Sequence, residues 1–360
     1  MVTFGKKKIG DGNKVFITFE VGPTHNGLSS AKNLVSQAAK AGADAVKFQM
    51  LDADRLVADK KVMFEYDILY KNNKTKRVKD SLYNLLKKRM LKPEEWIELK
   101  KFADKKKILF FATPGFIEEI DFLVKIGCKC IKIASSDVNH FPLIRHAAKK
   151  KVCIQLDTGN STLKEIENAI KIIEKEKNRN IIIHHCPSGY PAKTKGINLN
   201  IIKTLKKTFS YPIAFSDHSP GWEMDIAAVS MGANLVEKTI TEDRTTKSVE
   251  HIFSIEKEDL KKFVDKIHSL EIALGNHKRI MTKEELKKRE FVRRSAYLKK
   301  TAIKGTFLQD LEIEFRRPGF SISPDIYDKI LKKNMILKRN LPSGHKLKIK
   351  DLSPLKKSKK

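Results

Sequence analysis

Residues 15–49, VFITFEVGPTHNGLSSAKNLVSQAAKAGADAVKFQ, decide the fold of this 360-residue chain. The stretch opens with one apolar run, Val15–Glu20, and closes with a second, Asp44–Gln49. A strand, a helix and a second strand in this order predict a parallel βαβ unit. Between the two runs, apolar residues recur at the spacing of a helix that ends at Gly42, namely Leu28, Ala31, Leu34, Val35 and Ala38.

Six further strand-like runs follow, and most of them precede a segment with helical spacing. The runs are short and apolar without alternation, as expected for strands that are buried on both faces. Eight strands that alternate with helices favour a closed (β/α)8 TIM barrel over an open sheet. The predicted strands are Val15–Glu20, Asp44–Gln49, Ile108–Ala112, Cys130–Ile133, Val152–Leu156, Ile181–His185, Pro212–Phe215 and Leu235–Glu237.

Polar side chains stand at or just after the ends of these strands. The carboxyl ends of the strands of such a barrel converge on one face, and that face carries the chemistry. Lysines, hydroxyls, a histidine and carboxylates gathered there suit an anionic, oxygen-rich substrate. The residues are Glu20, Lys47, Gln49, Thr113, Lys132, Ser135, Asp157, Cys186, Ser188, Tyr190, Ser216, His218, Glu237 and Thr239.

Two parts of the chain depart from this alternating pattern. The stretch from Met50 to about Arg89 is too long for a plain loop, which predicts a lid or an interface element. The barrel is expected to span 1–275, and 276–292 is charged and helix-prone, which predicts a linker. Residues 293–360 have short strands, Gly and Pro turns and a weak internal echo, and we expect a small pseudo-symmetric β domain there.

The net charge of +30 comes from 73 Lys and Arg against 43 Asp and Glu, and it raises nucleic-acid binding as a hypothesis. The lysines are spread along predicted helix faces and the tail Lys356–Lys360, and no basic stretch interleaved with aromatic residues stands out. We therefore expect solvated faces and no nucleic-acid partner. The charge would still draw phosphorylated substrates toward the protein.

The location is predicted from hydropathy and from the cysteines. No apolar run reaches the length of a membrane span, and the N-terminus lacks the apolar stretch of a signal peptide. Cys128 and Cys130 have no second pair with metal-type spacing, so small buried side chains are favoured over a zinc site. A cytoplasmic, reduced protein with no membrane partner is expected.

Six motifs in order resemble the sialic acid synthase family, and the tail resembles its antifreeze-like (SAF) domain. The resemblance covers roughly residues 9–355. The barrel motifs are Glu20-Val-Gly-Pro-Thr-His-Asn-Gly, Ala43-Asp-Ala-Val-Lys-Phe-Gln, Phe111-Ala-Thr-Pro, Ile131-Lys-Ile-Ala-Ser-Ser-Asp, Phe215-Ser-Asp-His-Ser and Glu237-Lys-Thr-Ile-Thr. The tail motifs are Arg293-Arg-Ser and Arg316-Arg-Pro-Gly-Phe-Ser-Ile-Ser-Pro.

The resemblance implies the condensation of phosphoenolpyruvate with an N-acetylated amino-hexose, served by a divalent metal, Mn²⁺ or Mg²⁺. The products would be a nine-carbon 2-keto sugar acid and phosphate. The enol carbon attacks the open-chain aldehyde, water adds at the resulting cationic carbon, and the tetrahedral intermediate expels phosphate by C–O cleavage.

The residues at the strand ends fit these demands. Fixed cations and donors for phosphate and carboxylate can come from Lys47, Lys132, Thr113, Ser135 and Ser216. His218 would hold the metal that polarises the aldehyde, and Glu20 could anchor the sugar or move a proton at the aldehyde oxygen.

The resemblance further implies that Gln49, Tyr190 and Glu250 face the sugar, with Ser188 near the phosphoenolpyruvate. Asp157 and Glu237 are expected to bind substrate. Arg317 corresponds to the family arginine that reaches from one subunit's SAF domain into its partner's barrel, which implies a domain-swapped homodimer.

Four positions depart from the family pattern. Thr239 stands where the family usually has its second metal-ligating histidine, and a hydroxyl is a poor replacement for imidazole. Metal binding should therefore be weaker, or a neighbour such as Glu237 or Asp217 compensates. Asp157 replaces a usual Ser, Ser188 replaces Asn in several members, and Glu250 replaces Asp. These changes leave the amino sugar open between N-acetylmannosamine and a diacetamido sugar.

Two other classes of function remain open from the sequence. One is a Schiff-base pyruvate aldolase, also a barrel, with Lys132 as the amine nucleophile. The other is a non-catalytic, sugar-binding protein, which the absent histidine and the antifreeze-like tail would suit. Trapping with borohydride in the presence of pyruvate separates the first from the favoured mechanism, because that mechanism has no imine.

Overall fold

The structure is a computed structural model that describes residues 1–70, 74–275 and 277–355. These residues form two compact units, Met1–Gly275 and Asn276–Lys360. Asn276, at the start of the predicted linker, and residues 356–360, at the end of the predicted second domain, lie outside the described residues.

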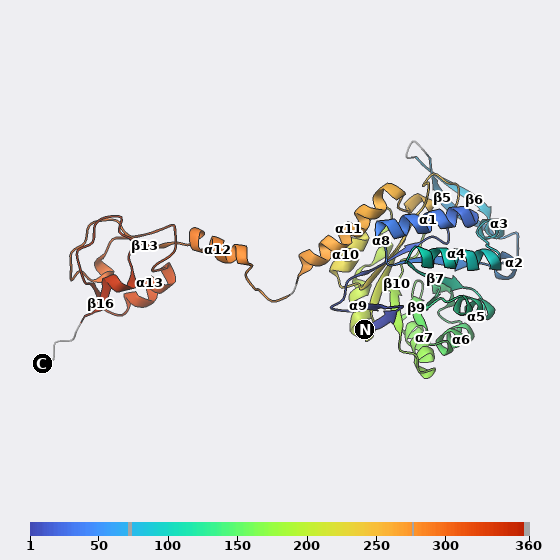
Figure 1. Cartoon of the computed structure of the whole chain (residues 1–360), viewed down its shortest axis with the longest axis horizontal. Coiled ribbons are helices and arrows are strands. Elements are labelled where there is room, and N and C mark those ends of the chain that lie inside the picture. Colours follow the sequence, from blue (N-terminus) through green and yellow to red (C-terminus); the bar gives the residue numbers. More distant parts are fainter. Residues whose placement is uncertain (71–73, 276, 356–360) are drawn as a thin grey trace. The chain divides into compact units, whose positions relative to one another are not determined.

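Eight parallel strands close into a barrel in the first unit, which confirms the predicted fold class (Figure 1). The strands are β3 (Phe16–Glu20), β4 (Ala45–Met50), β7 (Leu109–Pro114), β8 (Cys130–Ile133), β9 (Cys153–Asp157), β10 (Ile181–His185), β11 (Ile213–Asp217) and β12 (Leu235–Thr239). Each pairs with its neighbour in this order, and β12 pairs with β3 to close the ring. The predicted bounds agree with the observed ones to within two residues at each end.

Helices surround the barrel strands (Figure 1). They are α1 (Gly27–Ala41), α4 (Pro93–Lys105), α5 (Ile117–Lys125), α6 (Phe141–Lys149), α7 (Leu163–Lys175), α8 (Thr194–Ile197), α9 (Asn200–Thr208), α10 (Glu223–Ser230) and α11 (Lys257–Leu274). Helix α1 buries four of the five apolar positions that the sequence marks, and the fifth, Leu28, is partly buried against the core. The helix ends at Gly42, whose φ of 91° suits a residue without a side chain.

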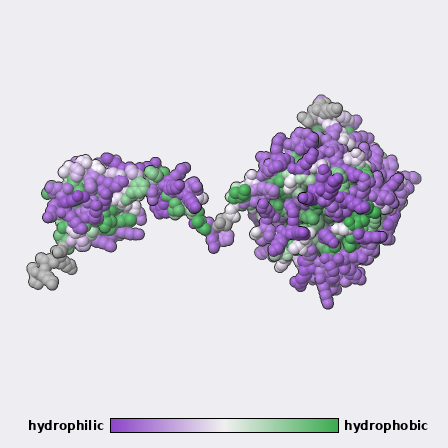
Figure 2. All heavy atoms as spheres, in the orientation of Figure 1, coloured by the Kyte–Doolittle hydropathy of each residue, from purple (hydrophilic) through white to green (hydrophobic). Residues whose placement is uncertain are grey.

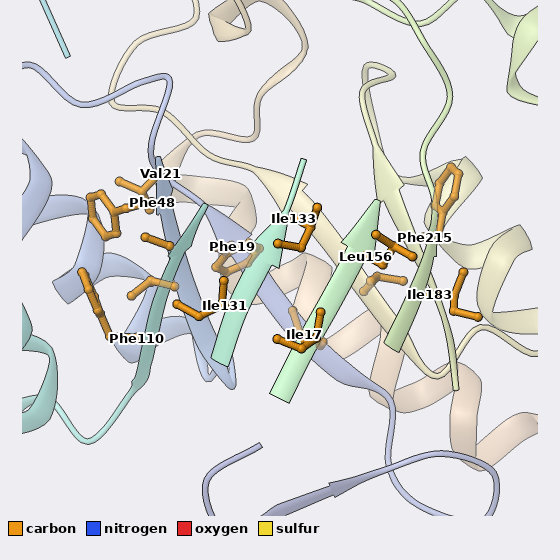
Figure 3. Close-up of a cluster of buried hydrophobic side chains, with 14 of the residues drawn as sticks. Ile17, Phe19, Val21, Phe48, Phe110, Ile131, Ile133, Leu156, Ile183 and Phe215 are labelled. Carbon is orange, nitrogen blue, oxygen red and sulfur yellow. The ribbon is translucent and has the colours of Figure 1, made fainter. Parts of the chain in front are cut away.

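Aromatic side chains fill part of the layer between strands and helices. Phe48 of β4 and Phe110 of β7 pack with ring centroids 5.2 Å apart, and Figure 3 shows both among the buried side chains of this layer. Trp96 of α4 lies edge-on to each of them, at 6.1 Å. Edge-to-face packing of this kind fixes α4 against the barrel wall.

An N-terminal hairpin closes the floor of the barrel, at the amino ends of its strands. It consists of β1 (Val2–Phe4) and β2 (Lys7–Ile9), which pair antiparallel. Phe4 is fully buried against Phe16 and Phe111, within a cluster that also contains Cys130 and Cys153. All four cysteines are free and buried, which confirms the prediction of small core side chains. The apolar floor leaves the opposite mouth as the polar end of the barrel.

The stretch between Met50 and Arg89 folds into a small subdomain. It contains α2 (Ala53–Leu56), a hairpin of β5 (Met63–Leu69) and β6 (Thr75–Ser81), and α3 (Leu82–Lys87). Tyr66 and Leu85 pack with Val249, which lies on the loop after β12. The buried Arg89 guanidinium lies 3.3 Å from His251 Nε2 on the same loop. The insertion is thus anchored beside the barrel mouth.

The second unit is small and β-rich, as predicted. It contains α12 (Lys283–Val292), the antiparallel pair β13 (Ser295–Leu298) and β14 (Ile313–Arg316), α13 (Pro324–Leu331), and the pair β15 (Met335–Leu337) and β16 (Leu352–Pro354). An antiparallel bridge also joins Ala302 to Leu341 within this unit. The unit has an apolar core of its own around Ala296, Leu298, Leu308, Ile322, Leu337, Leu347 and Leu352.

Hydrophilic side chains cover most of the visible face of the barrel unit (Figure 2). The lysines on the outer helices contribute to this surface, in agreement with the predicted solvated faces. Among the residues described, none of the helices combines the length and the apolar character needed to cross a bilayer.

Candidate functional site

Ten of the predicted site residues line one cavity of about 310 Å³ at the carboxyl ends of the barrel strands. Parallel strands bring these positions together because their ends meet on one face. Two further predicted residues, Lys132 and Ser216, are fully or almost fully buried and do not line the cavity. The lining residues are Glu20, Lys47, Gln49, Thr113, Ser135, Asp157, Tyr190, His218, Glu237 and Glu250.

One carboxylate, that of Glu237, joins two buried lysines. Its Oε1 lies 2.6 Å from Lys132 Nζ and 3.0 Å from Lys47 Nζ. Lys132 Nζ also lies 3.0 Å from Asp157 Oδ2 and donates to Ser216 Oγ at 3.1 Å. Lys47 additionally pairs with Glu20. Ammonium and carboxylate groups therefore alternate across the cavity and the layer beneath it.

Charge pairing fixes the protonation of this network. Burial disfavours the charged form of Glu237, but Lys132 and Lys47 outweigh burial and hold the pKa of this carboxyl well below its usual range. Burial likewise disfavours the charged Lys47, yet Glu20 and Glu237 raise the pKa of its ammonium well above its ordinary value. Burial disfavours the charged form of Asp157, but Lys132 outweighs burial and lowers the pKa of this carboxyl, so Asp157 stays ionised. An incoming anion must therefore compete with carboxylates that already hold the lysines.

Glu20 is held by the loop that follows β3. Its Oε1 accepts the backbone N–H of Gly22 at 2.6 Å, and its Oε2 pairs with Lys47. A Cβ on Gly22 would lie 2.5 Å from Gln49 N, so a glycine is required where this loop passes β4. Burial raises the pKa of Glu20, and Lys47 opposes that rise. Both oxygens of Glu20 are engaged as acceptors.

Glu250 presents a different kind of carboxyl group. It precedes the short helix η2 (His251–Phe253) with a φ of 74°, a left-handed conformation that costs about 1–2 kcal/mol for a residue with a side chain. Its side chain is buried, and Thr239 Oγ1 donates to its Oε2 at 3.2 Å. Burial, with Glu20 nearby, raises the pKa of Glu250 to about 8. Glu250 is therefore mostly protonated at neutral pH.

His218 and Tyr190 both line the cavity, and their rings pack against each other. Their ring centroids lie 4.8 Å apart, and His218 Nδ1 lies 3.2 Å from the carbonyl oxygen of Pro187. Burial lowers the pKa of His218, so the imidazole is neutral. With Nδ1–H donated to that carbonyl, Nε2 keeps the lone pair that a metal or a donor could use.

A family model described as the NeuB family matches residues 34–279. This chain belongs to the NeuB family. The resemblance seen in the six motifs is thereby confirmed.

Relatives of this NeuB-family chain include synthases of several nonulosonic acids. It is 35% identical over 346 residues to the N,N'-diacetyllegionaminic acid synthase of Legionella pneumophila, covering 94% of this chain and 95% of that one. It is 28% identical over 333 residues to the human N-acetylneuraminate-9-phosphate synthase, covering 91% and 90%. The crystal structure of the N-acetylneuraminic acid (sialic acid) synthetase of Leptospira borgpetersenii in complex with citrate superposes with a TM-score of 0.71 at 34% identity, covering 80% and 94%.

The NeuB family is generally metal-dependent, yet the donors around His218 do not form a complete ligand set. Within residues 1–70, 74–275 and 277–355, no group of three or more His, Cys, Asp or Glu could hold a metal ion. Asp217 is turned away from the cavity, because its carboxylate pairs with the buried Lys238 and accepts the N–H of Ser219 at 2.9 Å. Glu237 keeps one buried oxygen, Oε2, that has no partner in the described part of the chain.

Two predicted site residues lie elsewhere. Ser188 Oγ donates to Asn160 Oδ1 at 2.7 Å and lines a neighbouring cavity of about 620 Å³ instead of the one that holds Lys47. Arg317 is exposed in the second unit, just after β14. Within the barrel unit, the structure thus gathers the other predicted residues at one mouth and leaves Ser188 outside that group.

A layer of polar residues beneath the cavity was not predicted. His184 Nδ1 lies 2.9 Å from Ser216 Oγ, and His184 Nε2 lies 2.9 Å from Gln155 Oε1. Ser216 Oγ in turn donates to Asp157 Oδ1 at 3.1 Å. Burial, reinforced by Lys132, lowers the pKa of His184 to about 3, so the ring is neutral. The sequence feature that could have indicated this layer is the pair of histidines, His184 and His185, at the end of the otherwise apolar run that begins at Ile181.

Proposed function

We propose that this NeuB-family protein condenses phosphoenolpyruvate with an N-acetylated amino-hexose to give a nine-carbon 2-keto sugar acid and phosphate. The observation that carries the proposal is the pair of buried lysines bridged by Glu237 at the mouth of a NeuB-family barrel. Fixed ammonium groups in a mostly water-excluded site bind phosphate and carboxylate strongly. Relatives named as legionaminic, pseudaminic and N-acetylneuraminate-9-phosphate synthases support the substrate class.

The proposal assigns roles to residues that line the cavity and to two residues beneath it, Lys132 and Ser216. Lys47 and Lys132, with Thr113, Ser135 and Ser216, hold the anionic groups of phosphoenolpyruvate. Glu20, Gln49 and Tyr190 position the acceptor sugar through hydrogen bonds, so that the enol carbon faces the aldehyde. Holding both reactants in attack geometry replaces an encounter in solution by a step within one complex, which is a large part of catalysis in such reactions.

Schiff-base chemistry on Lys132 is disfavoured by its contacts. A nucleophilic lysine must present a free amine to its substrate. The Lys132 amine has no exposed surface and is held by Glu237, Asp157 and Ser216. We therefore assign this lysine to charge stabilisation.

The proposal extends to the metal, the assembly and the location. A divalent ion, Mn²⁺ or Mg²⁺, would bind through His218, with fewer protein ligands than in relatives that have a second histidine at the position of Thr239. We also propose that 276–292 is a linker and 293–360 an SAF domain, and that Arg317 completes the partner's site in a domain-swapped homodimer. The cytoplasm, where phosphoenolpyruvate is made, is the proposed location.

Phosphate release tests the proposed function directly. Purified protein is incubated with phosphoenolpyruvate, Mn²⁺ and either N-acetylmannosamine or a diacetamido sugar, and the 2-keto acid is identified by mass spectrometry. Release that depends on one of these sugars is expected. Release without a 2-keto sugar acid, or an adduct trapped by borohydride with pyruvate, would contradict the proposal. Sugar binding with no phosphate released would favour a non-catalytic protein.

A further inference from the structure

Glu250 differs from the other carboxyl groups of the cavity in its partners. Glu237, Asp157 and Glu20 each contact at least one lysine amine. Asp137 also lines the cavity, but it is only partly buried, and its carboxylate accepts from Ser136 Oγ at 3.2 Å. The Glu250 carboxyl accepts a hydrogen bond from Thr239 Oγ1 at 3.2 Å, and no ion pair holds it within the described ranges of the chain. It is thus the carboxyl of this cavity that is best placed to keep a proton and give it away.

We propose that Glu250 is the general acid that protonates the carbonyl oxygen of the acceptor sugar while the carbon–carbon bond forms. The inference rests on the proposed function. It assigns to one residue of this chain the proton that the step requires.

The backbone around Glu250 is built to hold this carboxyl in place. The left-handed φ of 74° at Glu250 is unusual for a residue with a side chain, and such conformations gather at functional sites. The loop is tied down because Ser254 Oγ donates to the Glu250 carbonyl oxygen at 2.6 Å. The side chain lines the cavity together with Tyr190 and Glu20. Hydrogen bonds from Thr239 to the carboxyl group and from Ser254 to the backbone carbonyl therefore hold Glu250 in one position in the cavity.

The surroundings favour the protonated form of Glu250. Burial is the main cause that raises its pKa to about 8, followed by the charge of Glu20 on β3, while Lys47 on β4 opposes the rise and Glu237 on β12 adds to it. The Arg89 guanidinium after α3 and the phenol of Tyr190 also interact electrostatically with Glu250. At pH 7 most molecules therefore carry the acid form.

No other group of the cavity is equally suited to deliver this proton. The oxygens of Glu20 already accept from Gly22 and Lys47, so this carboxyl acts as an acceptor. The neutral imidazole of His218 has its donor hydrogen directed at the Pro187 carbonyl. Burial raises the pKa of the Tyr190 phenol far above its usual range, which makes it a poor acid. Glu250 combines a proton with a pKa near the working pH, as efficient acid catalysis requires.

The proposed step balances as follows. The enol π pair of phosphoenolpyruvate forms a bond to the aldehyde carbon, and the C=O π pair moves onto oxygen, which takes the proton of Glu250. The cation left at C2 is captured by water, which loses one proton and leaves a hydroxyl group on C2. When the C–O bond to phosphate breaks, this hydroxyl becomes the ketone and its proton goes to the departing phosphate. The proton lost by water replaces the one given by Glu250 through solvent exchange, so no oxidant or further reactant is needed.

The test compares E250Q with the wild type and with E242Q. Glutamine keeps the shape of the side chain and a donor but cannot transfer a proton. Glu242 lies on the same loop, is exposed, and bonds Ser30 and Asn33 outside the cavity, so E242Q is a matched control that should retain activity. We expect E250Q to lower kcat by about 100-fold or more, the usual range for a lost general acid, with the Kd for phosphoenolpyruvate unchanged within about twofold.

The pH profile gives a second readout that needs no variant. Because the acid form is required, kcat/KM of the wild type, which reports the free enzyme, should be constant below about pH 8 and fall tenfold per pH unit above it. A profile that stays flat to high pH would overturn the role of Glu250, as would E250Q with wild-type kcat. A variant that loses phosphoenolpyruvate or sugar binding in calorimetry would show a binding residue instead. If the wild type releases no phosphate with any sugar, the proposed function and this inference both fail.

Discussion

Asp157→Ser should tighten the binding of phosphate groups to the cavity, because Asp157 competes with them for Lys132. The carboxylate lies 3.0 Å from Lys132 Nζ, and the amine has no exposed surface. Removing Asp157 leaves Glu237 at 2.6 Å as the counter-charge of this lysine. The ammonium then has one unfilled position for an anionic oxygen.

The size of the effect follows from the contacts that are lost and gained. A hydrogen bond to a charged group contributes about 1.5–3 kcal/mol, so Asp157→Ser should lower the free energy of unfolding by about that amount. Phosphate can recover a similar contact on Lys132, and about 1.4 kcal/mol corresponds to a tenfold change in Kd. We therefore expect inorganic phosphate and phosphoenolpyruvate to bind about tenfold or more tightly to the variant.

Calorimetric titration with inorganic phosphate and urea unfolding measure the two quantities. Asp121→Ser is the surface control, since Asp121 pairs with Lys150 at 2.6 Å while half exposed, and such pairs contribute about 0–1 kcal/mol. That variant should change neither quantity appreciably. Phosphate affinity that stays constant or falls in Asp157→Ser would refute the competition between Asp157 and substrate.

The contact between Asp157 and Lys132 also determines how the free energy of unfolding changes with pH. The folded-state pKa of Asp157 lies below its ordinary value of 3.8. Above pH 3.8 the carboxylate is ionised in both the folded and the unfolded protein, so its full contribution to the free energy of unfolding is present. As the pH falls through the folded-state pKa, the carboxylate is protonated and the contribution is lost. Urea unfolding in mildly to strongly acidic buffers should show a smaller acid-induced loss for Asp157→Ser than for the wild type.

Three further outcomes are expected. Lys132→Met should abolish turnover. It should also lower the free energy of unfolding by about 3–5 kcal/mol, because the buried carboxylates of Asp157 and Glu237 lose a cation. Near-wild-type stability in urea unfolding would contradict this prediction. Mixing Arg317→Ala chains with Glu20→Ala chains should restore part of the activity if sites are shared between subunits, and no recovery in verified heterodimers would argue against sharing. Thr239→His should tighten Mn²⁺ binding more than tenfold in a spin-resonance titration, and an unchanged Kd would remove His218 from the role of metal ligand.

The barrel could be predicted from the sequence because each of its strands is a short, mostly apolar run. A strand that is buried on both faces does not alternate between apolar and polar residues, so it is recognised as a near-continuous apolar run. The positions of Glu20, Lys47 and Glu237 followed from the same reasoning, since they end such runs. The N-terminal hairpin, by contrast, has two strands of three residues each, too short for a periodic signal.

The pairing inside the site could not be predicted, because it depends on strand register across the closed ring. His184 lies opposite Asp157 in the pairing of β9 with β10, and nothing in the local sequence fixes that register. Ser188 lies beyond the strand end on a loop, where the direction of a side chain is set by the turn. Its placement beside Asn160 therefore depends on the conformation of that loop and could not be predicted from the sequence.

The closed floor of the barrel has a consequence for kinetics. Phe4, Phe16 and Phe111 seal the amino ends of the strands, so both reactants must pass through a single opening. In the proposed reaction, the reactant that reaches down to Lys132 would occupy the deeper position, and the sugar beside Tyr190 would block its way out. The proposed function therefore predicts a compulsory order of addition, with phosphoenolpyruvate first and with phosphate leaving after the sugar acid.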